Sequence, residues 1–135
     1  MNKREKIFSW PVRVYFQDTD AGGVVYHASY VNFMERARTE WLRTFGYSNA
    51  GLMKALGVVF VVRSLKLDYL RPALLDDLLE VTAQIKAIGR SRVTLLQTVQ
   101  RSDELLTEGE VHLVCVSVDS FKPVSVPELL RKQWS

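Results

Sequence analysis

The spacing of apolar residues predicts one long amphipathic helix in the first third of the chain. Over residues 28–45, apolar side chains recur every three or four positions and share one helix face, with polar side chains opposite. The apolar face comprises Tyr30, Phe33, Met34, Ala37, Trp41 and Phe45, widened by Val31 and Leu42. It covers about half of the circumference, more than the stripe of a surface helix, so a curved sheet around the helix would suit it. Gly46 is expected to end the helix, and Arg38, inside the apolar arc, is expected to face a partner or an ion pair.

After this helix, the pattern of apolar and polar residues predicts strands joined by short turns. Residues 79–87 alternate apolar and polar side chains, as a strand with one buried face does. The run 58–62 is rich in β-branched residues and continuously apolar, so we expect it to be covered on both sides. The other expected elements are strands over 10–16, 58–69, 93–100 and 105–118, the last bulged at Gly109, a helical turn over 47–54 and a short charged helix over 128–133.

These elements correspond to a two-layer α+β fold, in which one helix packs on one face of an antiparallel sheet. The length of 135 residues predicts one domain, residues 1–135, large enough to bury a core of its own. The sequence contains no internal repeat, linker or low-complexity segment.

The composition is that of an ordinary globular protein, with 47% hydrophobic and 24% charged residues, which argues against disorder. The net charge of +3 suits an anionic small molecule, an acidic carrier protein or a phospholipid surface as a partner. Nucleic acid is not expected, because no basic cluster is interleaved with aromatic residues.

The single cysteine and the chain's apolar segments bear on the compartment. Cys115 lies in an apolar run, so we expect a buried structural thiol and no internal disulfide. Residues 1–6 are charged and no apolar segment follows them, so no secretory signal is expected. No segment approaches the ~20 apolar residues that a membrane helix needs, and we expect a cytoplasmic protein.

The residues between the first strand and the long helix carry the candidate chemistry. Asp18 and Asp20 follow the strand, Gly22 and Gly23 permit a tight turn, and the open N–H groups of a helix N-terminus come next. A carboxylate beside such N–H groups can act as a base or nucleophile next to an oxyanion site. Alternatively, Asp20 is a turn residue that accepts a hydrogen bond from its own loop. Two aspartates without a second cluster of oxygen ligands do not predict Mg²⁺, so Asp18 is expected to shape the loop.

Here the sequence resembles a known family. Residues 18–30, Asp-Thr-Asp-Ala-Gly-Gly-Val-Val-Tyr-His-Ala-Ser-Tyr, followed by Phe-Met-Glu-Arg-Ala-Arg at 33–38, resemble the signature of hotdog-fold acyl-CoA thioesterases. They are most similar to the YbgC branch of the 4-hydroxybenzoyl-CoA thioesterase family, which residues 60–63, 68–69 and 75–77 and Pro72 also resemble. The resemblance implies a hotdog fold, a long central helix wrapped by a five- to six-stranded antiparallel sheet, and acyl-CoA thioesterase activity.

The resemblance also implies roles for individual residues. Asp20 would be the catalytic carboxylate, either the nucleophile or the base that deprotonates water, and both roles stay open. The turn from Gly23 to His27 would form the oxyanion site, with the thioester oxygen against the backbone N–H of His27. The side chains of His27 and Tyr26 suit a pocket wall as well as loop packing. Ala21 replaces a proline and His27 an aromatic residue of the benzoyl-specific members, which speaks against an aromatic-acid substrate.

The resemblance places coenzyme A near Arg90, Ser91 and Arg92, where cations would meet its phosphates. A solvated turn is the alternative for these three residues. The implied partners are an acyl-CoA substrate and further copies of the chain, in a dimer joined edge to edge through the run 58–62 or in a tetramer. No metal or redox cofactor is expected, and coenzyme A enters the site as part of the substrate.

Two other functions stay open. One is an adaptor that binds acyl carrier protein and is linked to the Tol–Pal envelope system. The other is a hotdog dehydratase, which would use His27 with Glu40. On the helix wheel, Glu35 and Glu40 fall on the polar face, so we expect both to be surface or interface charges.

Overall fold

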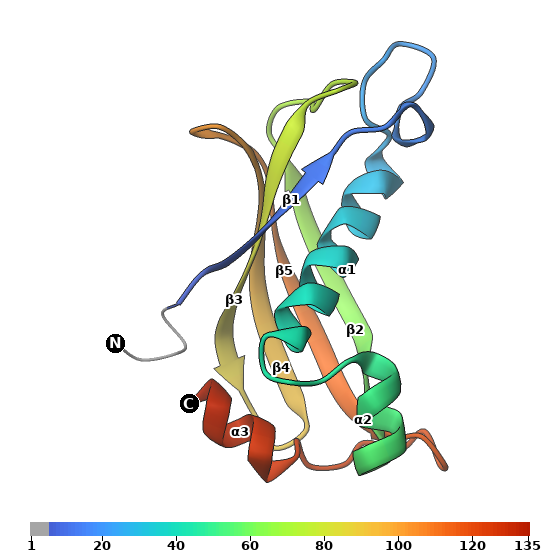
Figure 1. The fold of residues 1–135 in the computed structure, drawn as a ribbon, viewed down its shortest axis with the longest axis vertical. Helices are drawn as coiled ribbons and strands as arrows, with labels where there is room; N and C mark the ends of the chain where they lie inside the picture. Colours follow the sequence, from blue (N-terminus) through green and yellow to red (C-terminus); the bar gives the residue numbers. More distant parts are fainter. Residues whose placement is uncertain (1–5) are drawn as a thin grey trace.

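A five-stranded antiparallel sheet curves around one long helix (Figure 1). This computed structural model describes residues 6–135; residues 1–5, most of the segment in which we expect no secretory signal, lie outside the described residues. The strand order is β1-β3-β4-β5-β2. The elements are β1 (Phe8–Arg13), α1 (His27–Arg43), α2 (Asn49–Leu56), β2 (Val58–Tyr69), β3 (Leu78–Ile88), β4 (Arg92–Arg101), β5 (Glu104–Ser117) and α3 (Glu128–Trp134).

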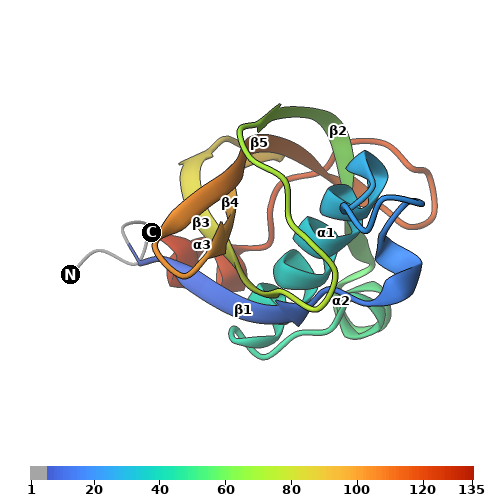
Figure 2. The same ribbon diagram turned by 90° about the horizontal axis from the view of Figure 1, so that it is seen from above.

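The long helix α1 lies in the hollow of the sheet. Seen from above in Figure 2, the sheet curves around this helix. The residues that α1 buries are Ser29, Tyr30, Phe33, Met34, Ala37, Trp41 and Leu42. Two turns follow the helix and end at Gly46, whose φ of 93° favours glycine. The wide apolar arc predicted from the sequence is therefore the face that packs against the sheet.

Aromatic side chains close the core at the end of the molecule away from the β1–α1 loop. Trp134 of α3 stacks on Trp41 of α1, with ring centroids 5.1 Å apart, and lies 5.6 Å from Phe60 of β2. Phe45 meets the Trp134 ring edge-on at 5.9 Å. The short C-terminal helix thus belongs to the core rather than to a solvent-exposed tail.

Strand β2 is an edge of the sheet, and the expectation that the run 58–62 is covered on both sides is wrong for this chain. Val58 is buried, but Val62 is 49% exposed. The strand pairs with β5 on one side only, so its other edge carries unpaired backbone groups. The apolar run therefore packs against the core on the helix-facing side of β2, and no described residue covers the free edge of the strand.

The predicted bulge in β5 lies at Leu106 and not at Gly109. Val99 pairs with Thr107 and Gln100 with Leu105, which leaves Leu106 as the extra residue. The Leu106 carbonyl accepts hydrogen bonds from Leu70 and Arg71, at 2.8 and 3.0 Å, where the chain leaves β2. Gly109 stays in register, and a Cβ atom there would push the end of the Leu67 side chain aside and crowd the Lys66 carbonyl.

Arg38 is hydrogen-bonded rather than ion-paired. Its Nη1 donates to Oε1 of the buried Gln97 at 2.9 Å. Gln97 Nε2 in turn donates to the carbonyls of Met34 and Thr82, at 3.0 and 3.2 Å. Burial lowers the pKa of Arg38. This polar link ties the middle of α1 to the sheet.

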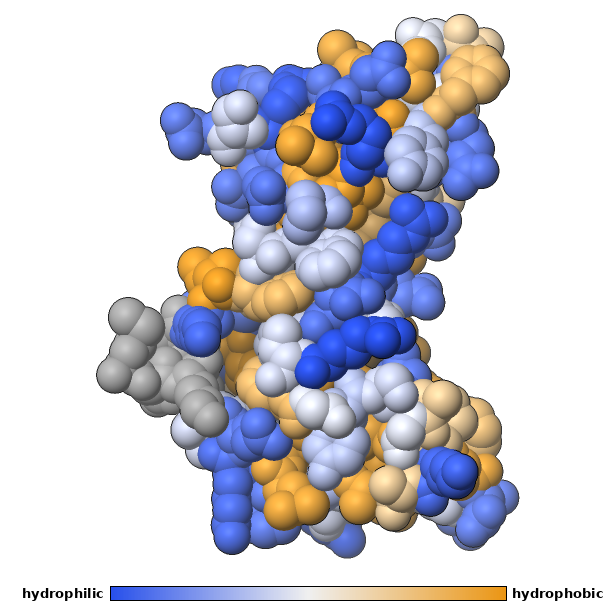
Figure 3. All heavy atoms as spheres, in the orientation of Figure 1, coloured by the Kyte–Doolittle hydropathy of each residue, from blue (hydrophilic) through white to orange (hydrophobic). Residues whose placement is uncertain are grey.

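On the face shown in Figure 3, polar side chains predominate along the middle and apolar side chains gather near the two ends. At the end that carries the β1–α1 loop, Phe16 is 80% exposed and Leu74 is 44% exposed. Among residues 6–135, no helix is long and apolar enough to cross a membrane.

Candidate active site

The loop between β1 and α1 is organised around the buried carboxylate of Asp18. Its Oδ2 accepts the backbone N–H of Tyr15 at 2.8 Å. The Asp18 carbonyl accepts the N–H of Tyr26 at 3.0 Å and the hydroxyl of Ser29 at 3.1 Å. One residue thereby fixes the start of the loop, its end and the first turn of the helix, which confirms the loop-shaping role predicted for it.

Asp20 lies in a tight turn on the exposed side of the same loop. Its N–H donates to the Val24 carbonyl at 3.0 Å, and its carbonyl accepts the Gly23 N–H at 3.1 Å. Gly23 has a φ of 75°, which a side chain would oppose. Oδ1 of Asp20 accepts the Gly22 N–H at 3.0 Å, whereas Oδ2 has no hydrogen-bond partner among residues 6–135. The carboxylate is thus oriented through one oxygen and open through the other.

The N-terminus of α1 offers open N–H groups beside this turn. Tyr26 is the N-cap residue, and its side chain, 59% exposed, does not cap the helix. The N–H of Gly23 is used inside the turn, but that of His27 reaches no backbone carbonyl among the described residues. In this structure Gly23 therefore shapes the turn, and His27 carries the open donor at the positive end of the helix dipole.

A small hollow of about 220 Å³ opens next to the helix N-terminus. The Tyr69 ring lies 4.6 Å from the His27 ring, and its hydroxyl donates to the His27 carbonyl at 3.2 Å. The buried Tyr30 hydroxyl accepts the Ala73 N–H at 2.9 Å, as expected for a core tyrosine with a satisfied hydroxyl. Burial raises the pKa of both tyrosines, so their hydroxyls stay protonated near neutral pH. The hollow is lined by Val24, Val25, His27, Tyr30, Tyr69, Leu70, Arg71 and Pro72.

The segment that links β2 to β3, residues 70–77, crosses over the Asp20 loop and holds it; we call it the crossing segment. The Val25 N–H donates to the Ala73 carbonyl at 2.9 Å, and the Leu75 N–H donates to the Gly23 carbonyl at 3.0 Å. These two bonds flank Val24, whose carbonyl accepts the N–H of Asp20. The position of Asp20 thus depends on the crossing segment.

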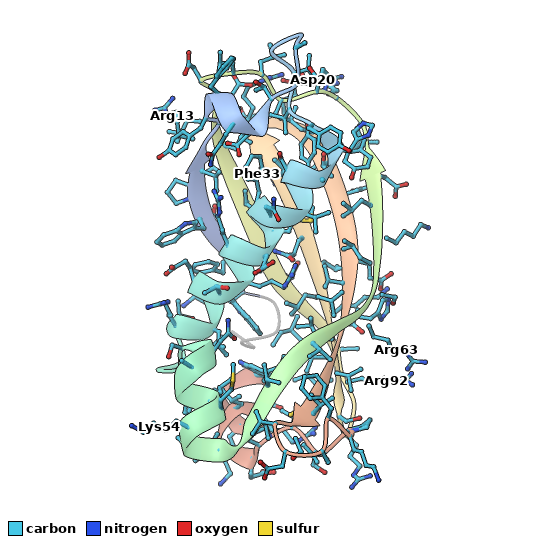
Figure 4. The ribbon with its side chains drawn as sticks, turned by 90° about the vertical axis from the view of Figure 1, so that its right-hand side faces the viewer. Arg13, Asp20, Phe33, Lys54, Arg63 and Arg92 are labelled. Atoms are coloured by element: carbon cyan, nitrogen blue, oxygen red, sulfur yellow. The ribbon has the colours of Figure 1, made fainter. Side chains whose placement is uncertain are left out.

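The predicted coenzyme A residues lie at the other end of the sheet. Arg90 Nε donates to the Ser125 hydroxyl at 3.0 Å, and the Ser91 carbonyl accepts the Cys115 N–H at 2.7 Å. Arg92 is exposed, and Figure 4 shows it together with Arg63 in the half of the molecule opposite to Asp20. One chain by itself therefore does not bring these cations to the Asp20 loop.

The helix glutamates are also remote from the loop within one chain. Glu40 pairs with Arg43 at 3.7 Å and lies about 20 Å from His27 along the axis of α1, at ~1.5 Å per residue. Glu35 is exposed. Among residues 6–135, no group of three or more His, Cys, Asp or Glu side chains is arranged to hold a metal ion.

Sequence reasoning did not identify Tyr69 or the crossing segment as parts of the site. Tyr69 contacts His27 across 42 positions of sequence. The one available signal was the alternation that places Leu65, Leu67 and Tyr69 on the same face of β2. That signal indicates burial, and it does not say which loop the last residue meets.

Three comparisons identify the family. Residues 14–134 match the model of the thioesterase-like superfamily. The acyl-CoA thioester hydrolase YbgC of Escherichia coli is 51% identical over 95% of this chain and 96% of its own, and the acyl-CoA thioesterase YbgC of Haemophilus influenzae is 44% identical over 92% and 91%. A probable thioesterase from Bartonella henselae, a crystal structure, superimposes with a TM-score of 0.86 at 33% identity and covers 90% of this chain and 100% of its own. The family and hotdog fold predicted from the sequence are thereby confirmed: the chain is a thioesterase of the thioesterase-like superfamily and belongs to its YbgC branch.

Proposed function

We propose that this chain hydrolyses acyl-CoA thioesters to a free acid and coenzyme A, with Asp20 as the catalytic carboxylate. The observation that carries the proposal is the placement of Asp20, held through Oδ1 and open through Oδ2, on a loop that ends at the open N–H of His27. The YbgC relatives are named as acyl-CoA thioester hydrolases and thioesterases, which supports the substrate class.

In this mechanism the thioester carbonyl oxygen lies against the His27 N–H, so that the helix dipole and the donor stabilise the negative charge that develops there. As a base, Asp20 takes a proton from water while the water oxygen attacks the carbonyl carbon. As a nucleophile, Asp20 attacks directly and forms an anhydride, which water then cleaves. In both routes the carbon–sulfur bond breaks, and the coenzyme A thiolate leaves and takes up a proton. Neither route calls for a metal or a redox cofactor.

The proposal includes a second copy of the chain. A two-fold axis at the free edge of β2 pairs that strand with itself in antiparallel orientation. The Val58 end of one strand then lies near the Tyr69 end of the other, and the end of the sheet that carries Arg90, Ser91 and Arg92 approaches the partner's loop. The half-exposed Val62 on the free edge supports this pairing. Such a dimer, alone or within a tetramer, would let these cations bind coenzyme A.

The compartment that fits this proposal is the cytoplasm. Cys115 is a free, buried thiol, and the described residues contain no disulfide, which is typical of proteins in reducing surroundings.

The test is hydrolysis of acyl-CoAs from C2 to C16 and of a benzoyl-type thioester by wild type and by Asp20→Asn. We expect wild type to cleave part of this panel and Asp20→Asn to lose on the order of 10²-fold or more in kcat, because the amide can neither take the proton nor attack. Glu110→Gln, in the middle of β5, where Glu110 pairs with Lys86 at 2.6 Å, is the matched control and should keep wild-type activity.

Full activity of Asp20→Asn would refute the assignment. A wild type inert on every thioester, but able to capture acyl carrier protein, would point to the adaptor. Loss of activity in Glu40→Gln with an active Asp20→Asn would point to the dehydratase.

A further inference from the structure

We propose that Arg101, the last residue of β4, is a positioning residue for the reaction: it anchors the crossing segment, which in turn holds the loop that carries Asp20. The inference rests on the proposed role of Asp20. Arg101 does not line the hollow beside His27 and is assigned no contact with the substrate. It acts through Asp77 and the backbone of residues 72–75.

The guanidinium of Arg101 joins two carboxylates and a carbonyl. Nη1 pairs with Oδ2 of Asp77 at 2.7 Å and donates to the Pro72 carbonyl at 3.3 Å. Nη2 pairs with Oε1 of Glu104 at 2.5 Å. The Asp77 and Arg101 side chains are only 20% and 27% exposed, so solvent screens this pair less than it screens an ion pair on an open surface.

Glu104 fixes Arg101 in place. It accepts from Arg101 and, through its other oxygen, pairs with Arg71 at 2.6 Å. Both hydrogen-bonded arginines hold the pKa of Glu104 below its ordinary value, so the acceptor stays charged at neutral pH. Glu104 of β5 thus orients the guanidinium of Arg101 so that its Nη1 faces Asp77.

Asp77 connects Arg101 to the crossing segment through two hydrogen bonds with the backbone of Leu74. The same Oδ2 that pairs with Arg101 accepts the Leu74 N–H at 2.9 Å, and the Asp77 N–H donates to the Leu74 carbonyl at 3.1 Å. Asp76, inside this turn, has a φ of 71°, a backbone conformation that L-residues seldom adopt. A turn of this kind needs outside contacts to persist, and the Arg101–Asp77 pair supplies one.

From this turn, two backbone hydrogen bonds reach the catalytic loop. Leu75 donates to the Gly23 carbonyl, and Ala73 accepts from Val25. Asp20 lies between these contacts and has no ion pair of its own among the described residues. Loss of the anchor would therefore let Asp20 shift relative to the His27 N–H.

A shift of about 1 Å between reacting groups can cost up to 10²-fold in rate. The cost in folding stability is expected to be small, because Asp77 and Glu104, 20% and 32% exposed, can be solvated by water when Arg101 is lost. Rate and stability should therefore respond differently to the loss of Arg101. A residue with only a structural role would lower both together or neither.

The experiment compares Arg101→Gln, Asp77→Asn and Arg101→Lys with Lys86→Gln. Lys86 pairs with Glu110 at 2.6 Å on strands β3 and β5, which makes it a control ion pair without contact to the loop. We expect kcat to fall about tenfold or more in Arg101→Gln and Asp77→Asn while KM stays within about twofold. Arg101→Lys should restore part of the rate, because lysine keeps the charge but not the fork. Lys86→Gln should behave as wild type.

Amide hydrogen exchange gives a readout that does not depend on activity. The N–H groups of Val25 and Leu75 should exchange faster in Arg101→Gln than in wild type, and at the wild-type rate in Lys86→Gln. Unchanged kcat in Arg101→Gln, or unchanged exchange at these two amides, would overturn the inference. Failure of the proposed function is recognised separately, because either the wild type would then be inert on every thioester or Asp20→Asn would stay active, whatever the Arg101 variants do.

Discussion

The two aspartates of the β1–α1 loop show how surroundings assign different roles to the same residue type. Asp18 is buried, and its carboxylate holds the loop by accepting a hydrogen bond from a backbone N–H group. Asp20, two positions later, is exposed and keeps one oxygen open. The Asp-x-Asp spacing by itself does not distinguish these roles. The glycines after Asp20 do, because they place the turn, and with it the open carboxylate, at the second aspartate.

At the level of single residues, Gly109 is the glycine at which an added methyl group would meet the closest neighbours. A Cβ at this position would overlap the Leu67 side chain and approach the Lys66 carbonyl at 3.1 Å. We expect Gly109→Ala to lower the free energy of unfolding by about 1–3 kcal/mol, measured by urea denaturation. Gly89→Ala is the control, since its nearest neighbour would be the Arg92 carbonyl at 3.7 Å, and should stay within about 0.5 kcal/mol of wild type. Equal stability of the two variants would contradict the overlap.

Cys115 predicts how stability depends on alkaline pH. Burial raises the pKa of its thiol from 9.0 to about 11. The folded pKa lies above the unfolded one, so this contribution is fully present below pH 9 and is lost as the pH rises from 9 through 11. Between pH 8 and 10.5 we expect wild type to lose about 1–2 kcal/mol more unfolding free energy than Cys115→Ala. Guanidinium titrations at both pH values measure this difference, and equal losses in the two proteins would refute it.

At the level of elements, the sequence was sufficient to predict the helices and strands whose apolar periodicity reflects packing within one chain. The long helix, the four later strands and the C-terminal helix all lie within a few residues of their predicted bounds. The first strand begins and ends earlier than predicted, because Tyr15 already belongs to the turn built on Asp18. The run 58–62 was wrongly predicted to be covered on both sides, because an apolar edge strand and a fully covered strand have the same composition.

Only the local half of the candidate site could be predicted from the sequence. Its local half, residues 18–30, follows from one short stretch of glycines, aspartates and a helix start. Its second half comes from the crossing segment, from Tyr69 and from Arg101, all more than 40 positions away from Asp20 in the sequence. Contacts of that kind leave no periodic signal in a single sequence, because a backbone hydrogen bond such as that from Leu75 to Gly23 depends on no particular side chain.

At the level of the whole molecule, the structure separates the two sets of residues that the sequence assigned to one site. Asp20 lies at one end of the sheet and Arg92 at the other, as Figure 4 shows. Both assignments hold together only if a second chain, turned end for end, supplies the missing half. An antiparallel pairing of β2 edges would build two such sites per dimer, because the two halves of a two-fold interface are equivalent.

This arrangement predicts that two inactive proteins restore activity when mixed. Asp20→Asn removes the carboxylate, and the double variant Arg90→Ala with Arg92→Ala removes the cations while leaving Asp20 intact. After unfolding and refolding together, half of the dimers should be mixed, and each should contain one site with both halves native. We therefore expect about a quarter of wild-type activity from the mixture, measured at acyl-CoA concentrations low enough for weakened binding to show. A mixture as inactive as its parents would mean that each site is built from one chain, and that these arginines serve another purpose.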